Sequence, residues 1–154
     1  MEQNRSKPRR KLEPVWSPFN IAAISIAGLA VLSFFLPLFS FPNMTANYFT
    51  YLIRWFDGTH KFNLVIAISL SVGLLLALAM LGLSFFKGRF SVIAAVAAIL
   101  VITFALYYVY LRGVEFSGEL LLETTKHFGW GYSLFLVFSL LHIPVKLFAH
   151  SMQK

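Results

Sequence analysis

The sequence predicts an all-α integral membrane protein, a bundle of four transmembrane helices with N and C termini in the cytoplasm and two outer loops that carry short interfacial helices. Three observations predict this class. Of the 154 residues, 58% are hydrophobic and only 12% are charged, whereas about a quarter of a typical soluble domain is charged. The apolar residues form blocks of about twenty, the length that a helix needs to cross ~30 Å of hydrocarbon. Cations gather between alternate blocks, as they do in cytoplasmic loops.

The four apolar blocks define the expected spans, at about 19–39, 62–86, 90–111 and 130–148. The two central spans are joined by Lys87-Gly88-Arg89, a joint so short that it turns the chain straight back. The two cations of this joint indicate a cytoplasmic turn. The first span begins with Ser17 as a cap and Pro18 in the first turn. It is too long to be a cleaved signal peptide, so we expect it to be retained.

The spans form one membrane domain over residues 17–149. Residues 1–16 are a basic cytoplasmic tail with too few apolar side chains to fold, and residues 150–154 are a short cytoplasmic end. Contacts with anionic lipid headgroups are expected from cations of the tail and of the central turn, namely Arg9, Arg10, Lys11, Lys87 and Arg89. Alternatively, the cations of the tail serve only to orient the first helix during insertion.

Two independent residue types support this orientation. With both termini inside, nine of the 13 Lys and Arg residues fall in cytoplasmic segments, and the outer loops hold Arg54, Lys61, Arg112 and Lys126. All six tyrosines lie at or beyond the outer ends of the spans, where amphipathic rings are favoured. The net charge of +7 therefore reflects membrane orientation and lipid affinity, and we expect no nucleic-acid partner.

Both outer loops show helical spacing. In the first loop, Tyr48, Leu52 and Trp55 recur on one side of a short helix that would lie flat in the headgroup region. This side is either a docking surface or a simple interfacial belt. In the second loop, Glu119 and Glu123 share a face with His127.

Glu119, Glu123 and His127 are the candidate metal ligands, since zinc and other divalent cations accept carboxylate and imidazole groups. The first and last of them stand eight residues apart, which is ~12 Å along a helix. That distance is too long for one ion, so at most adjacent pairs can share a site. The alternative is a solvated face in which Glu123 pairs with His127.

Small residues mark where two helices are expected to pack. Ser69, Gly73 and Ala77 lie four apart on the second span, and Ala94 and Ala98 offer a matching pair on the third. Small side chains let helices approach closely in lipid. These faces are expected to meet inside the central hairpin, or else one of them faces another subunit.

Between the membrane interfaces the sequence is expected to hold no Asp, Glu, Lys or Arg. Lys146 stands near the cytoplasmic end of the fourth span, where its side chain is expected to reach the headgroups. His142 is then the one polar intramembrane candidate. It is either a proton relay or ligand, or a neutral histidine hydrogen-bonded to a neighbouring helix.

The sequence contains no cysteine, which excludes thiolate catalysis and Cys-ligated metals. No phosphate-binding loop or hydrolase constellation is present, and no cofactor is expected. The favoured hypothesis is a non-enzymatic accessory or stabilising subunit, in contact with lipids and with other membrane subunits or copies of itself. The short loops suit a bacterial cytoplasmic membrane.

Two other functions remain open. One is an oligomeric channel, transporter or lipid-handling protein with an uncharged path lined by small hydroxyl side chains, namely Ser25, Ser69, Ser71, Thr103 and Ser139. The other is an enzyme or metal-binding protein at the outer surface, acting through the acidic second loop.

Overall fold

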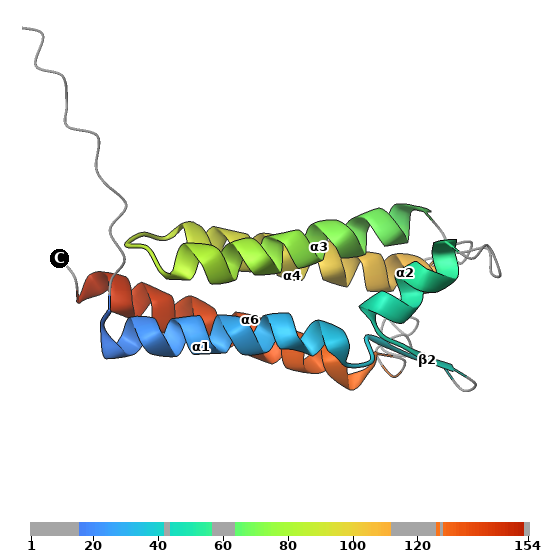
Figure 1. Cartoon of the computed structure of the whole chain (residues 1–154), viewed down its shortest axis with the longest axis horizontal. Helices are drawn as coiled ribbons and strands as arrows, with labels where there is room; N and C mark the ends of the chain where they lie inside the picture. The colour runs from blue at the N-terminus through green and yellow to red at the C-terminus, as the bar shows by residue number, and fades with distance from the viewer. Residues whose placement is uncertain (1–15, 42–43, 57–63, 112–125, 127, 153–154) are drawn as a thin grey trace, which may run out of the picture.

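The computed structural model describes residues 16–41, 44–56, 64–111, 126 and 128–152 (Figure 1). Four of its helices are long and apolar enough to cross a membrane, with mean hydropathies of 1.7 to 2.7. This confirms the prediction of a multi-pass, all-helical membrane protein. The elements in chain order are α1 (Pro18–Leu32), the 3-10 turn η1 (Ser33–Phe35), β1 (Phe39–Phe41), β2 (Met44–Ala46), α2 (Tyr48–Phe56), α3 (Leu64–Ser84), α4 (Phe90–Leu111) and α6 (Trp130–Ser151).

The four long helices form a closed ring. Helix α1 packs against α6 and α3, and α4 packs against the same two helices, so α3 and α6 are diagonal partners. Figure 1 shows that α1 begins and α6 ends beside the turn from α3 to α4. We call this the hairpin end of the bundle. The opposite end, which carries α2 and the two short strands, is the α2 end.

Helix α1 is shorter than the expected span at 19–39. Its start is as expected, because the Ser17 hydroxyl accepts a hydrogen bond from the Asn20 amide at 3.1 Å. Its last turn tightens into η1 and then stops at Leu36, which is extended with ψ 159°. The cause is Pro37, whose ring disfavours the helical conformation in the residue before it. The helical conformation therefore ends a few residues before the expected end of the span at about residue 39.

Helix α6 is longer than the expected span at 130–148. It continues to Ser151, and the Met152 amide still donates to the Phe148 carbonyl at 3.1 Å. Pro144 lies inside this helix without ending it. A proline is tolerated within a packed membrane helix when neighbouring groups satisfy the freed backbone.

The segment after η1 holds two short strands that the sequence pattern did not predict. Strands β1 and β2 pair in antiparallel register, with Ser40 opposite Thr45. Asn47 then caps α2, because its side-chain oxygen accepts from the Thr50 amide at 2.8 Å. The amide group of Asn47 also donates to the Phe35 carbonyl at 3.2 Å, which attaches the start of α2 to the end of η1.

The start of α6 is fixed by backbone contact with the segment that follows η1. The Gly129 amide donates to the Leu38 carbonyl at 2.9 Å, and the Gly131 amide donates to the Pro37 carbonyl at 2.8 Å. A Cβ atom at Gly131 would lie 2.7 Å from the Leu36 carbonyl oxygen and 2.8 Å from that of Ser33. These atoms belong to the backbone, so they cannot move aside cheaply.

We therefore expect Gly131→Ala to destabilise the protein by about 1–3 kcal/mol, the usual cost of overpacking a close contact. Gly28→Ala is the matched control, because a Cβ atom there meets nothing within 4 Å and alanine is the better helix former. The free energy of unfolding in mixed detergent micelles measures both. Equal stability of the two variants would contradict the close backbone contact.

Candidate functional site

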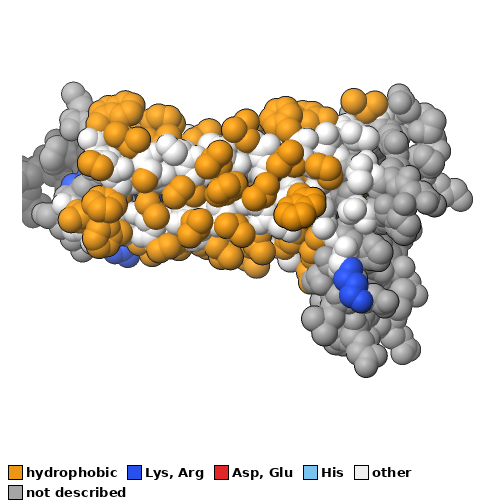
Figure 2. Space-filling model, turned by 90° about the horizontal axis from the view of Figure 1, so that it is seen from below, with side chains coloured by type: hydrophobic (Ala, Val, Ile, Leu, Met, Phe, Trp, Pro, Cys, Tyr) orange, Lys and Arg blue, Asp and Glu red, His pale blue; other side chains and the backbone are white. Residues whose placement is uncertain are grey.

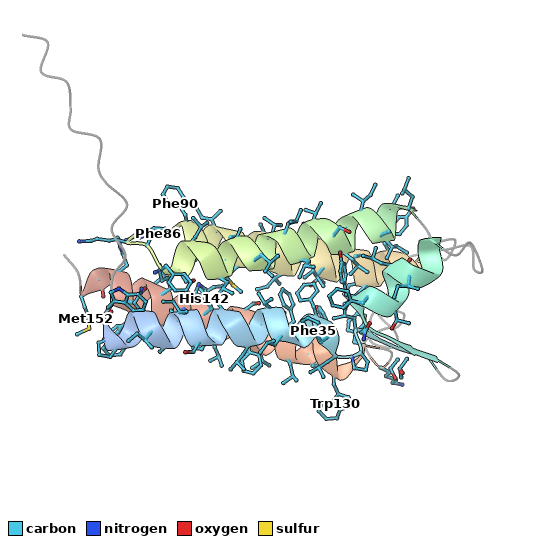
Figure 3. The ribbon with its side chains drawn as sticks, in the orientation of Figure 1. Phe35, Phe86, Phe90, Trp130, His142 and Met152 are labelled. Carbon is cyan, nitrogen blue, oxygen red and sulfur yellow. The ribbon has the colours of Figure 1, made fainter. Side chains whose placement is uncertain are left out.

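Polar side chains gather inside the bundle at its hairpin end. Asn20 of α1, Ser84 of α3, and His142 and Lys146 of α6 are each at most 2% exposed. Figure 3 shows the His142 side chain lying between the helices rather than on the outer surface. We call these four residues the buried polar cluster. It joins three of the four long helices.

The Lys146 ammonium group makes three hydrogen bonds within this cluster. It donates to the Asn20 side-chain oxygen at 2.5 Å, to the Ser84 carbonyl at 2.7 Å and to the Phe86 carbonyl at 3.0 Å. The last carbonyls of a helix have no partner within the helix and carry its negative pole. Lys146 therefore caps the C-terminus of α3 from across the bundle.

This position corrects the expectation for Lys146. We expected its side chain to reach the lipid headgroups and the spans to contain no charged residue. Lys146 instead lies inside α6, on the same buried face as His142 one turn before it. The carbonyls at the end of α3 take the place of water and headgroups as acceptors, which is why the ammonium group can stay inside.

Oxygen dipoles balance the Lys146 charge within the described part of the chain. All three acceptors are neutral amide or carbonyl oxygens. All six acidic residues of the chain lie outside the described residues. The cluster is therefore rich in hydrogen-bond acceptors and carries one cation.

His142 is fully buried and contacts two other helices. Its Nδ1 lies 3.1 Å from the Ala23 carbonyl of α1, and its Nε2 lies 3.5 Å from the Ser84 hydroxyl of α3. The Ser84 hydroxyl itself donates to the Met80 carbonyl at 2.6 Å. Ser84 thus contacts both α6 residues of the cluster, since its carbonyl binds Lys146 and its hydroxyl lies beside His142.

A second group of polar contacts lies at the α2 end. The Tyr132 and Thr103 hydroxyls are 2.9 Å apart, and those of Tyr48 and Ser71 are 3.3 Å apart. Between the two polar groups, Phe135 packs edge-on against Phe34 with ring centroids 5.4 Å apart. The bundle therefore has polar contacts near both ends and an aromatic pair between them.

The small residues singled out from the sequence lie mostly in the core. Gly73 of α3 faces Ile102 of α4, where an added Cβ atom would collide with the isoleucine side chain. The three alanines Ala77, Ala94 and Ala98 are buried. Ser69 is half-buried and borders a groove between α3 and α4.

The hydroxyl residues proposed to line an uncharged path differ in their burial and in their hydrogen bonds. Ser25 is exposed on the outside of α1, and Ser139 is fully buried without a hydrogen-bond partner. Ser71 and Thr103 are bonded to tyrosines at the α2 end.

The other candidates divide between the exterior and the undescribed part of the chain. Lys87 and Arg89 are exposed at the turn between α3 and α4. The remaining candidate headgroup and metal ligands lie outside the described residues: Arg9, Arg10, Lys11, Glu119, Glu123 and His127.

Sequence reasoning missed Asn20 and Ser84. Each is a polar residue in a terminal turn of an apolar helix, Asn20 in the first turn of α1 and Ser84 in the last of α3. The spacing of His142 and Lys146, one turn apart with apolar residues on both sides, was a further signal of a polar face. Intramembrane ionisable residues usually face a bundle interior.

Comparisons with protein-family models, with curated proteins and with solved structures found no match to this chain.

The hydrogen bond between Lys146 and Asn20 makes these two residues energetically dependent on each other. In a double-mutant cycle, Asn20→Leu and Lys146→Met should show a coupling of about 1–3 kcal/mol, because either single change removes one partner of a buried hydrogen bond. The free energy of unfolding in mixed micelles is measured for both single variants and the double variant.

Arg89→Met replaces Lys146→Met in the control cycle, since Arg89 is an exposed cation at the same end of the bundle. The control pair should be additive within about 0.5 kcal/mol. Additivity of Asn20→Leu with Lys146→Met would show that the ammonium group does not depend on Asn20.

Proposed function

We propose that this chain is a non-enzymatic accessory or stabilising subunit of a larger membrane complex. The observation that carries this proposal is the filled interior of the bundle. Among the described residues, large side chains from η1, α3, α4 and α6 are fully buried, namely Phe34, Leu70, Met80, Ile102 and Phe135. Where the described helices meet, these side chains occupy the interior, and the bundle offers its outer surface for interaction.

The outer surface is hollowed beside α3. One groove of about 340 Å³ lies between α3 and α4 and is bordered by Leu100 and Phe104. A second groove of about 280 Å³ lies between α2 and α3 and is bordered by Leu52 and Leu75. Ile68 and Val72 border both grooves. We assign this double groove to a transmembrane helix of the partner subunit, because its lining is almost wholly apolar and membrane helices associate by close packing.

The rest of the surface supports placement in a bilayer. Figure 2 shows hydrophobic side chains along the whole middle of one face, with Lys and Arg side chains near its ends. Trp16 is 70% exposed at the hairpin end and Trp130 is 79% exposed at the α2 end, and Trp130 points away from the bundle (Figure 3). Tryptophan is favoured at both membrane interfaces.

We place the hairpin end, and with it both termini, in the cytoplasm. The exposed cations Lys87 and Arg89 support this orientation, since cationic loops are retained on the cytoplasmic side. Helix α2 then lies at the outer interface. A bacterial cytoplasmic membrane is the proposed location.

One observation favours a second function, that of a transporter or channel. His142 and Lys146 are ionisable residues buried within a candidate span, and such residues commonly mark ion or proton pathways. The buried rings of Phe34 and Phe135 pack against each other nearer the α2 end, so a conduction path inside the bundle would have to pass them. Ion or proton flux above that of empty liposomes would favour this function over the first.

The subunit hypothesis predicts a heteromeric assembly that depends on the double groove. The native mass after gentle detergent extraction, with mass spectrometry of co-purifying chains, should show one defined partner. Val72→Trp, which fills the groove, should reduce recovery of that partner at least about tenfold, as expected when an interface is sterically blocked.

Leu29→Trp is the matched control, because Leu29 is similarly exposed on α1 and lies away from the groove. It should leave recovery of the partner unchanged. A monomer or homo-oligomer without a partner would refute the subunit hypothesis. Equal recovery with both variants would refute the assigned surface alone.

A further inference from the structure

The hydrogen-bond partners of His142 determine where its protons lie. Nδ1 faces the Ala23 carbonyl at 3.1 Å. A carbonyl oxygen only accepts hydrogen bonds, so Nδ1 must carry a hydrogen and donate it. In a neutral ring the other nitrogen, Nε2, is then an acceptor with a free lone pair.

The group opposite Nε2 is also set as an acceptor. The Ser84 hydroxyl has one hydrogen, and the short 2.6 Å bond to the Met80 carbonyl uses it. Ser84 Oγ therefore presents a lone pair toward Nε2 at 3.5 Å. As long as the hydroxyl keeps its bond to Met80, a neutral His142 places two acceptors face to face at 3.5 Å.

We propose that His142 is a proton-binding site in the interior of the bundle, where a proton taken up at Nε2 completes a hydrogen bond to the Ser84 hydroxyl. The proton comes from water and adds one positive charge to the ring. Both ring nitrogens are then donors, and both have an acceptor already in place. No side chain needs to change its rotamer for the bond to form.

None of the charged groups described around this site favours the uptake of a proton. Lys146, one turn along α6, is the described cation nearest in the fold, and it binds the carbonyl of the same Ser84. The other two members of the cluster, Asn20 of α1 and Ser84 of α3, are uncharged and do not ionise. Lys87 and Arg89, before α4, are exposed outside the bundle. Lys146 is therefore the main group that disfavours a second positive charge.

This inference goes beyond the proposed function, because a stabilising subunit has no need of a proton. It concerns a ligand class, the proton, and a site assigned from hydrogen-bond geometry alone. Either inference can fail without the other, since proton binding is measured on the isolated protein and partner binding on the extracted complex.

The experiment is nitrogen NMR of the full chain, labelled with ¹⁵N-histidine and held in lipid nanodiscs, over a range of pH. His142→Asn identifies the signals of His142. We expect the neutral ring to carry its hydrogen on Nδ1 and to convert reversibly to imidazolium as the pH falls. A neutral ring with its hydrogen on Nε2, or a ring that stays neutral until the protein unfolds, would overturn the proposal.

Two variants separate a built proton site from a merely buried ring. Ser84→Ala removes the acceptor and should weaken proton binding about tenfold, as expected for a hydrogen bond to a charged group. Lys146→Met removes the opposing charge and should raise the imidazolium fraction at a given pH.

Ser139→Ala is the matched control, because Ser139 is another buried serine and is not hydrogen-bonded to His142. It should leave the titration unchanged. If Lys146→Met does not fold, Ser84→Ala decides the question. An unchanged titration in Ser84→Ala would refute the role of the Ser84 hydroxyl.

Discussion

The hydrogen bonds of the Lys146 ammonium group are the interaction on which the hairpin end of the bundle depends. In hydrocarbon a backbone carbonyl without a donor is costly, and the end of a helix leaves several such carbonyls. Helix α3 ends at Ser84 inside the bundle, where Lys146 supplies the missing donor. Because Lys146 also binds Asn20, one side chain closes α3 and sets the distance between α1, α3 and α6.

The same constraint is met by different means at the α2 end. There the helical conformation ends before Pro37, so the carbonyls of Pro37 and Leu38 need hydrogen-bond donors from another element. The amides of Gly131 and Gly129 supply them, which requires a backbone approach too close for a side chain. Asn47 does the same for the Phe35 carbonyl while capping α2. Both ends of the bundle are thus held by donors that reach carbonyls of another element.

Hydropathy and length were enough to predict four spans, because lipid demands long apolar helices whatever their packing. The helix α1 ends earlier than hydropathy alone predicts, because Pro37 acts on the conformation of Leu36, a local effect that hydropathy does not weigh. The burial of Lys146 was missed for another reason. The position of Lys146 along its span indicates only its depth in the membrane. The acceptors that keep its ammonium group inside come from α1 and α3, and that pairing depends on the tertiary structure. The strands β1 and β2 are three residues each, too short to produce a periodic pattern.

Ser84 takes part both in the cap of α3 and in the proposed proton site. Its carbonyl binds Lys146 and its hydroxyl faces His142, so a charge gained at His142 acts on the helix that Lys146 holds. Because large side chains are buried between the described helices, such a change would be expressed as a shift of helices against one another. Helix α3 also borders both parts of the double groove. A partner helix docked there would contact the helix on which the proton acts, which would give the proposed subunit a physical route to respond to pH.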